Sequence, residues 1–179
     1  MNWILSSAIA ALTMLQGPAA AQPLDPRTET DAYTVYGSAL GLKPPVILMR
    51  ETEGPSHSCS DFIDRLSGEW REVAKDFREK NARTWLLQPG VLRFEYRLIS
   101  KAEILADDAR LAKQYPGHSN APPPGSIQYV AVSAVGFNAT RTKALVYVHT
   151  RVHGGVLRLI RSGNSWVRDP QGSTCAWIA

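Results

Sequence analysis

The chain has 179 residues, of which 44% are hydrophobic and 20% are charged, a composition that fits one globular domain with a real core. The net charge is +4, but basic residues alternate with acidic ones along most of the chain, whereas nucleic-acid binders gather Lys and Arg on one face. No nucleic-acid partner is therefore expected. Beyond the N-terminus no apolar run approaches the length of a membrane span, so we expect a soluble mature protein without a transmembrane segment.

The N-terminus has the pattern of a secretory signal peptide. Residues 1–21 contain no Lys, Arg, Asp or Glu, residues 4–15 form a short apolar run, and the small residues 19–21 offer a cleavage site. The usual basic residue at the start is missing, and the alternative is a buried N-terminal helix. We predict a signal peptide in residues 1–21, cleavage after Ala21, a single domain in residues 22–179, and a secreted or periplasmic location.

Two cysteines, Cys59 and Cys175, allow only one intramolecular pair. In an oxidising compartment a disulfide is the favoured state, and chain entropy for so long a loop gives an upper figure of roughly 4–5 kcal/mol. The alternative is a free catalytic thiol at Cys59, with His57 two residues before it. We predict the disulfide.

Three helices are predicted in the N-terminal two thirds. Residues 28–40 carry apolar side chains at spacings of three and four, and Gly41 ends the pattern. Residues 56–81 form the longest segment, with one apolar stripe and one charged, solvated face, although Gly68 allows two helices with a bend. Residues 100–113 begin with Ser100 and Glu103 at the spacing of a capping box.

Two strands are expected between these helices. Residues 46–49 are a short continuous apolar run, typical of a buried strand. Residues 91–99 alternate, which predicts a half-exposed antiparallel strand. Residues 115–125 contain four prolines and no periodicity, so they are expected to form a loop.

From residue 128 onward the chain alternates in the manner of an antiparallel meander. With Phe137 opposite Ala144, Val135 would face Val146 and the apolar residues of both strands would share one side. Further turns are predicted at Gly154-Gly155 and around Gly163-Asn164, and residues 174–178 would close the sheet with Trp177 in the core. The predicted fold is α+β: an antiparallel meander of four to five strands in the C-terminal half, packed against N-terminal helices.

The C-terminal third resembles a family of uncharacterised exported bacterial α+β proteins. The resemblance rests on residues 135–138 (VGFN), 144–148 (ALVYV), the Gly154-Gly155 pair, residues 163–166 and the terminal Trp177-Ile178. It implies export and this sheet, but no activity. A looser likeness, to cone-shaped domains of the nuclear transport factor 2 type, implies a pocket on the concave face of the sheet. Members of the family often carry cysteines near the Gly-Gly turn, where this chain has His149 and His153.

A search for chemical motifs finds no nucleophile elbow, no zinc-protease motif, no phosphate-binding loop and no Cys-x-x-Cys. No cofactor is therefore expected. Asp107-Asp108 is interpreted as a solvated helix end, because adjacent acids on a helix point apart. Glu51 and Glu53 could present a carboxylate pair, and the favoured alternative is the polar exit of a buried strand.

The remaining candidate is the outer face of the predicted sheet, with Tyr147, His149, Arg151, His153 and Arg158. A two-residue turn at the glycine pair would set Arg151 opposite Arg158, and two guanidinium groups so placed would suit an anion. Asp169 is the competitor, because the next turn would place it opposite Arg158. The two His give too few ligands for a metal, so no metal site is predicted.

These patterns favour an exported, non-catalytic binding or interaction module, whose partner is an unknown protein or a small anionic ligand. The alternative is a small envelope enzyme, or an anion-binding domain, with its site on the His149/Arg151/His153/Arg158 face. A ligand-sized pocket containing His149 would favour the enzyme.

Overall fold

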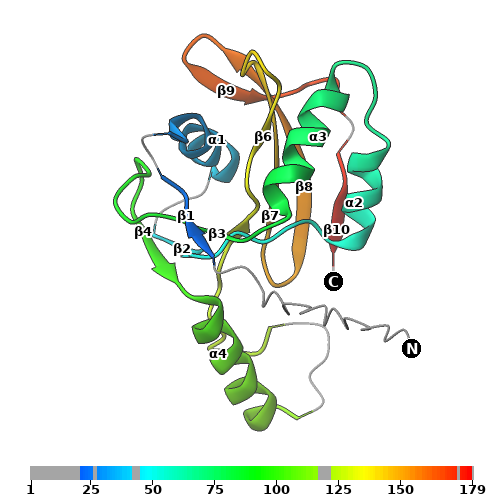
Figure 1. Cartoon of the computed structure of the whole chain (residues 1–179). Helices are drawn as coiled ribbons and strands as arrows, with labels where there is room; N and C mark the ends of the chain where they lie inside the picture. The colour runs from blue at the N-terminus through cyan, green and yellow to red at the C-terminus, as the bar shows by residue number, and fades with distance from the viewer. Residues whose placement is uncertain (1–20, 26–27, 42–44, 117–121, 173, 179) are drawn as a thin grey trace, which may run out of the picture.

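The computed structural model describes residues 21–25, 28–41, 45–116, 122–172 and 174–178. Helix α1 (Thr30–Leu40) lies on one side of a central sheet, and helices α2 (His57–Asp64) and α3 (Trp70–Asn81) lie on the other, while α4 (Lys101–Gln114) projects away from this body (Figure 1). The predicted α+β class is confirmed.

The main sheet is antiparallel and comes from the C-terminal half, as predicted. Its path runs β10-β8-β7-β5, and two short strands are added because β6 pairs with β7 and β9 pairs with β8. Its six strands are β5 (Ala131–Val132), β6 (Gly136–Phe137), β7 (Lys143–His149), β8 (His153–Ser162), β9 (Ser165–Arg168) and β10 (Ala176–Ile178).

The predicted pairing of β6 with β7 is confirmed, since Phe137 lies opposite Ala144. Beyond it the register shifts by one, so that Val132 rather than Ser133 lies opposite Val148. The extra residue lies in a bulge over residues 133–135, where side chains replace missing backbone partners. The Ser133 hydroxyl accepts a hydrogen bond from the Tyr147 amide at 2.8 Å.

The β7–β8 hairpin differs from the prediction. His149 lies opposite Gly154 and Val148 opposite Gly155, so the chain turns at residues 150–152 and both glycines belong to β8. The glycines serve another purpose: a Cβ at Gly154 would lie 2.8 Å from the Trp177 indole nitrogen, and one at Gly155 would lie 2.6 Å from the Cys175 carbonyl. They permit the close approach of β10.

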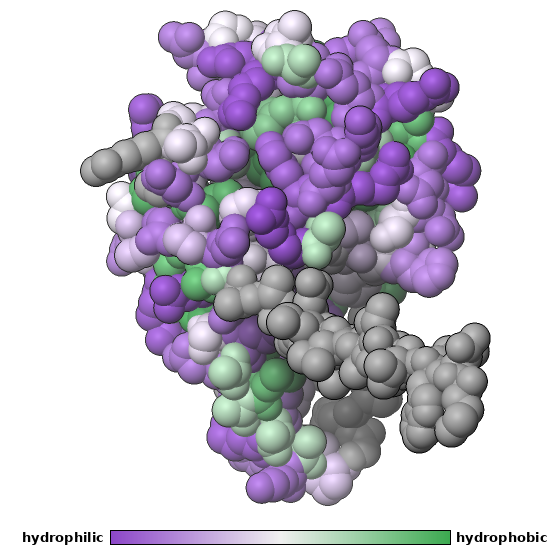
Figure 2. Space-filling model, viewed as in Figure 1, coloured by the Kyte–Doolittle hydropathy of each residue, from purple (hydrophilic) through white to green (hydrophobic). Residues whose placement is uncertain are grey.

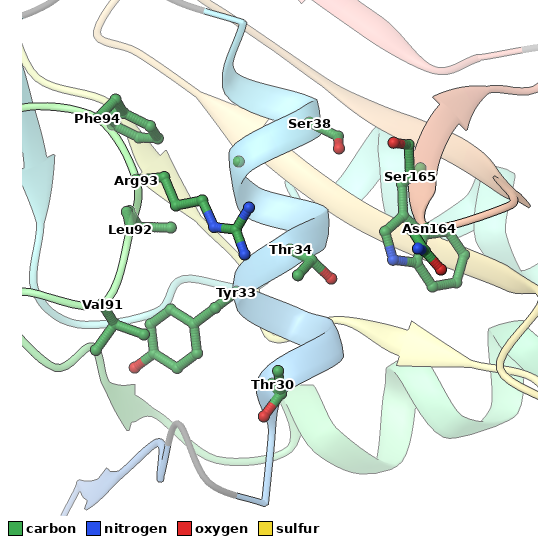
Figure 3. A pocket seen from close by; sticks show the side chains of 12 residues that line it. Thr30, Tyr33, Thr34, Ser38, Val91, Leu92, Arg93, Phe94, Asn164 and Ser165 are labelled. Atoms are coloured by element: carbon green, nitrogen blue, oxygen red, sulfur yellow. The ribbon is translucent and has the colours of Figure 1, made fainter.

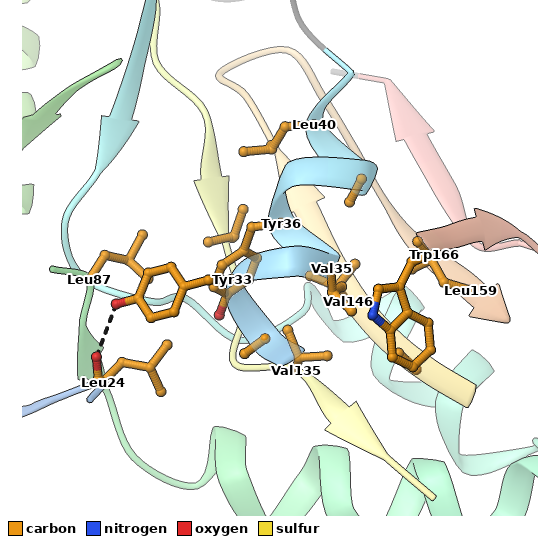
Figure 4. Close-up of a cluster of buried hydrophobic side chains, with 14 of the residues drawn as sticks. Leu24, Tyr33, Val35, Tyr36, Leu40, Leu87, Val135, Val146, Leu159 and Trp166 are labelled. Atoms are coloured by element: carbon orange, nitrogen blue, oxygen red, sulfur yellow. Dashed lines mark hydrogen bonds between the residues drawn. The ribbon is translucent and has the colours of Figure 1, made fainter. Parts of the chain in front are cut away.

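Helix α1 covers one face of the sheet, and it ends where Gly41 adopts a left-handed conformation with φ of 44°. Its inward side chains, among them Val35 and Tyr36, belong to the same core cluster as Val146 of β7 (Figure 4). The Tyr36 hydroxyl donates to the Ser133 carbonyl at 2.9 Å, so the helix also satisfies a backbone group of the bulge.

Helices α2 and α3 cover the opposite face. The predicted long helix is divided in two around Gly68, whose φ is 59°. The cluster beneath the helices includes Phe77, Leu145 and Tyr147. The Cys59–Cys175 disulfide, with a Cα–Cα distance of 5.4 Å, ties α2 to the segment before β10, as predicted. The expectation that this face is the outer side of the sheet is wrong, because a second layer of helices buries it.

A smaller group of strands joins the sheet at its β5 side. Strand β2 (Val46–Met49) forms as predicted, but it pairs in parallel with β4 (Tyr96–Ile99), for which an antiparallel partner was expected. A bridge between Leu48 and Val130 connects the pair to the main sheet. Strands β1 (Gln22–Pro23) and β3 (Trp85–Leu86) form a second parallel pair.

Helix α4 begins with the predicted capping box, in which the Ser100 side chain accepts from the Glu103 amide and the Glu103 side chain accepts from the Ser100 amide. On the face seen in Figure 2, which is largely hydrophilic, apolar residues gather over this helix, where Leu105 is 58% exposed. Among the described residues, no helix is both long and apolar enough to span a membrane. Residues 1–20 of the predicted signal peptide lie outside the described part of the chain.

Candidate ligand-binding cleft

A cleft of about 430 Å³ lies against the outward side of α1, beside the end of the sheet that carries the β8–β9 hairpin. One wall is the segment before β4 and the other is the β8–β9 hairpin, so three parts of the sequence meet there (Figure 3). The lining residues are Thr30, Tyr33, Thr34, Gly37, Ser38, Val91, Leu92, Arg93, Phe94, Asn164, Ser165 and Trp166.

The floor of the cleft follows from the helical period. Thr30, Thr34, Gly37 and Ser38 recur at spacings of four, three and one, so they share the outward face of α1, and all four are exposed. Because these side chains are small, they leave space above this face of the helix. A Cβ added at Gly37 would meet no atom within 4 Å, so the space above it is open.

The first wall is held in place by two tyrosine hydroxyls. Tyr33 of α1 accepts a hydrogen bond from the Gln88 amide at 2.9 Å and donates to the Leu24 carbonyl at 3.0 Å (Figure 4). Tyr96 donates to the Gln88 carbonyl at 3.0 Å and accepts from the Val91 amide at 3.1 Å. These bonds fix the turn after β3, and the four residues that follow it, 91–94, line the cleft.

The second wall is a tight hairpin. Ser162 pairs with Ser165, which leaves the predicted two-residue turn in which Gly163 has a φ of 57°. Asn164 occupies the tip, and Trp166 packs its ring 5.7 Å from the Phe137 ring. Trp166 is therefore anchored in the core while its edge lines the cleft.

Several polar groups of the cleft have no partner among the described residues. The Arg93 guanidinium and the side chains of Ser38, Asn164 and Ser165 make no hydrogen bond or ion pair with any described residue. Trp166 is only 5% exposed, and its indole N–H donates to no described residue. The only described buried side-chain nitrogen or oxygen without a partner is Nε of Arg158, so the accessible part of Trp166 must include its indole nitrogen.

The predicted His/Arg face lies elsewhere. None of Tyr147, His149, Arg151, His153 and Arg158 is among the residues lining this cleft. Tyr147 is 2% exposed, and its hydroxyl accepts from the Trp177 indole at 2.7 Å.

His149 is packed among aromatic rings and bound to a carboxylate. Its Nε2 lies 2.8 Å from Glu53 Oε2, and its Nδ1 lies 3.2 Å from the Thr150 carbonyl oxygen. Both neighbours are hydrogen-bond acceptors, so both ring nitrogens of His149 face an oxygen. The hydrogen bond from His149 lowers the pKa of Glu53 to about 2, with Lys101 acting in the same direction against partial burial. Glu53 is thus part of an ion-pair cluster, and Glu51 is separate from it, accepting from the Lys101 amide.

Arg151 anchors α4 to the β7–β8 turn. Its guanidinium pairs with Asp107 and Asp108 and donates to the Ile127 carbonyl at 2.8 Å. Asp107 also accepts from the Ile127 amide, which is the main reason that the pKa of this carboxyl is lowered. The interpretation of Asp107 as a solvated helix end is wrong, because its side chain is only 5% exposed.

Arg158 forms an ion pair with Asp169, which the sequence analysis named as the alternative to an anion. Its guanidinium lies 2.7 Å from Asp169, and its charged carbon lies 4.1 Å from the centre of the Trp70 ring. The residue opposite Arg158 is Leu145 rather than Arg151, so the predicted pair of facing arginines is not formed. His153 is exposed at the start of β8.

Within the described ranges, no group of three or more His, Cys, Asp or Glu side chains is arranged to hold a metal. No protein-family model, curated protein or solved structure matches the chain. The family resemblance therefore stays a prediction. The predicted strand over residues 91–99 is shorter in the structure, because β4 begins at Tyr96. The sequence did not indicate the cleft, because residues 91–94 fold over α1 through tyrosine contacts that no local pattern encodes.

Proposed function

We propose that this protein is an exported, non-catalytic binding module, and that it takes a small ligand in the cleft between α1, residues 91–94 and the β8–β9 hairpin. The observation that carries the proposal is the set of unpartnered polar groups beside apolar side chains in a cleft of about 430 Å³. Ligand sites have this character: they are concave, largely preformed and furnished with a few polar groups that fix orientation.

The rigidity of the walls supports the proposal. Both walls are fixed by bonds that do not involve a ligand: tyrosine hydroxyls hold the first wall, and strand pairing holds the second. A preformed site loses less entropy when a small molecule binds.

The engaged state of the titratable groups on the other side of the sheet supports a binding role over a catalytic one. His149 uses both ring nitrogens, while Arg151 and Arg158 are paired with carboxylates. A general base needs a free nitrogen or oxygen within reach of its substrate, and these side chains are bonded to carboxylates and backbone carbonyls of the protein.

Export is supported by the uncharged N-terminal run and by the Cys59–Cys175 bond, which fits an oxidising compartment. N-terminal sequencing of protein recovered from outside the cytoplasm tests it. The expected first residue is Gln22, and an intact Met1 on that material would refute the signal peptide.

The binding proposal is tested by filling the cleft. A panel of small aromatic and aliphatic compounds is screened by ligand-observed NMR against wild type, Gly37→Ala and Gly37→Leu. The leucine side chain would occupy the open space above α1, whereas the alanine methyl group adds little bulk. Compounds should bind wild type and Gly37→Ala and lose binding in Gly37→Leu, whose fold is verified by circular dichroism. The proposal fails if no compound binds, or if binding is the same in all three proteins.

A further inference from the structure

The lining of the cleft carries charge of one sign only, which is positive. Arg93 is the only charged residue among the twelve that line it, and no Asp or Glu is among them. A cationic ligand would find no counter-charge there. An anion would find a guanidinium whose donors are not used by any described residue.

The donors lie on both walls. Figure 3 shows the Arg93 side chain reaching from the first wall over α1, with Asn164 and Ser165 on the opposite wall. The indole N–H of Trp166 adds a donor from a ring that is 5% exposed. The indole nitrogen is accessible and donates to no described residue, so it is available to an acceptor on a ligand.

The rest of the lining is apolar. Val91, Leu92 and Phe94 extend the first wall, and the Tyr33 ring lies beside Val91. The Tyr33 hydroxyl is not an additional donor for a ligand, because it is bound to Leu24 and Gln88, and burial raises the pKa of this phenol. A purely inorganic anion would leave the apolar wall unused.

We infer that the ligand of this cleft is an amphipathic organic anion: a carboxylate or similar planar oxyanion attached to an apolar or aromatic body. The oxyanion accepts from Arg93, with Asn164, Ser165 and the Trp166 N–H as further donors across the cleft. The body packs against Val91, Leu92 and Phe94. The planar guanidinium suits a carboxylate because it can donate two parallel hydrogen bonds. This inference rests on the proposed binding function of the same cleft.

The test compares ligands that differ in one property. The probes are 4-phenylbutyrate, its uncharged amide 4-phenylbutyramide, and butyrate, which keeps the charge and lacks the ring. Dissociation constants are measured by NMR titration at low and moderate salt. The acid should bind wild type at least about tenfold more tightly than the amide, since hydrogen bonds to charged groups are the stronger kind. Butyrate should bind more weakly than phenylbutyrate, and added salt should reduce the preference for the acid.

Arg93→Gln supplies the matched variant, and Arg97→Gln is the control, because Arg97 is an exposed arginine close in sequence but outside the lining. Arg93→Gln should remove the preference for the acid, and Arg97→Gln should keep it. Trp166→Phe, which keeps a buried aromatic ring and removes the N–H, should weaken binding of the acid more than binding of the amide.

The outcomes separate the two proposals. If acid and amide bind equally and Gly37→Leu blocks both, the cleft is a ligand site and the anion inference is wrong. An acid preference that survives in Arg93→Gln also overturns the inference. If neither probe binds wild type and the wider panel fails as well, the binding function falls, and the inference falls with it.

Discussion

The ion pair between Glu53 and His149 joins the segment after β2 to the end of β7, and it should contribute a pH-dependent part of the stability. Glu53→Gln removes the charge and keeps the shape. In the folded protein the pKa of Glu53 is about 2, against 4.5 for an ordinary Glu. At about 1.36 kcal/mol for each pKa unit, the ceiling is roughly 3 kcal/mol. The side chain is 32% exposed, so screening by water reduces the expected value to about 1–2 kcal/mol.

The direction follows from the lowered pKa. A carboxylate whose folded pKa lies below its unfolded value stabilises the protein fully above about pH 4.5, and loses that effect as the pH falls toward 2. Urea unfolding of wild type and Glu53→Gln is measured from pH 3 to 6. The variant should be less stable by about 1–2 kcal/mol at pH 6, and the difference should shrink toward pH 3.

Glu95→Gln is the control, because Glu95 is exposed and its side chain has no partner among the described residues. It should change stability by less than about 0.5 kcal/mol. A Glu53→Gln deficit that is independent of pH, or no deficit at pH 6, would show that the charge of Glu53 does not stabilise the fold.

Three further predictions concern packing. Gly136→Ala should destabilise the protein by about 1–3 kcal/mol in urea unfolding, because the new Cβ would lie 2.4 Å from the Phe77 Cβ and 2.5 Å from the Phe77 Cα. An unfolding midpoint close to that of wild type would contradict this close contact. Val146→Asp places an unpaired carboxylate at a fully buried position, so circular dichroism should detect no cooperative thermal transition. A melting curve like that of wild type would show that the face of β7 carrying Val146 is not buried. The double variant Cys59→Ala/Cys175→Ala should have an unfolding free energy lower by up to about 5 kcal/mol. A thiol assay on unfolded, unreduced wild type should find no free thiol, and a count of two thiols would contradict the bond.

Local patterns in the sequence determined much of the secondary structure. The helical period located α1, the apolar run located β2, and the spacing of Ser100 and Glu103 located the start of α4. Each depends on residues within one or two turns of chain, where spacing and capping set the backbone without outside help. The Cys59–Cys175 bond was also predictable, because two cysteines leave one intramolecular pairing.

Local patterns did not determine which faces are covered or what each special residue is for. Gly154 and Gly155 were assigned to a turn, yet they allow β10 to approach β8, and a sequence does not distinguish a glycine needed for its dihedral freedom from one needed for its missing Cβ. Asp107 was assigned to solvent, and it is buried by Arg151, which lies 44 residues away along the chain.

The candidate cleft belongs to the same class of feature. The outward face of α1 lies beside Arg93 and Asn164 because Tyr33 bonds the loop after β3 to the helix, Tyr96 holds that loop in shape, and the β8–β9 hairpin lies next to α1. The sequence by itself determined the helices, most of the strands and the disulfide. The tertiary structure decided which charged side chains form ion pairs and which have no partner. Pairing between residues far apart in the sequence depends on how the helix and sheet layers stack, and the spacing of the residues along the chain does not determine it.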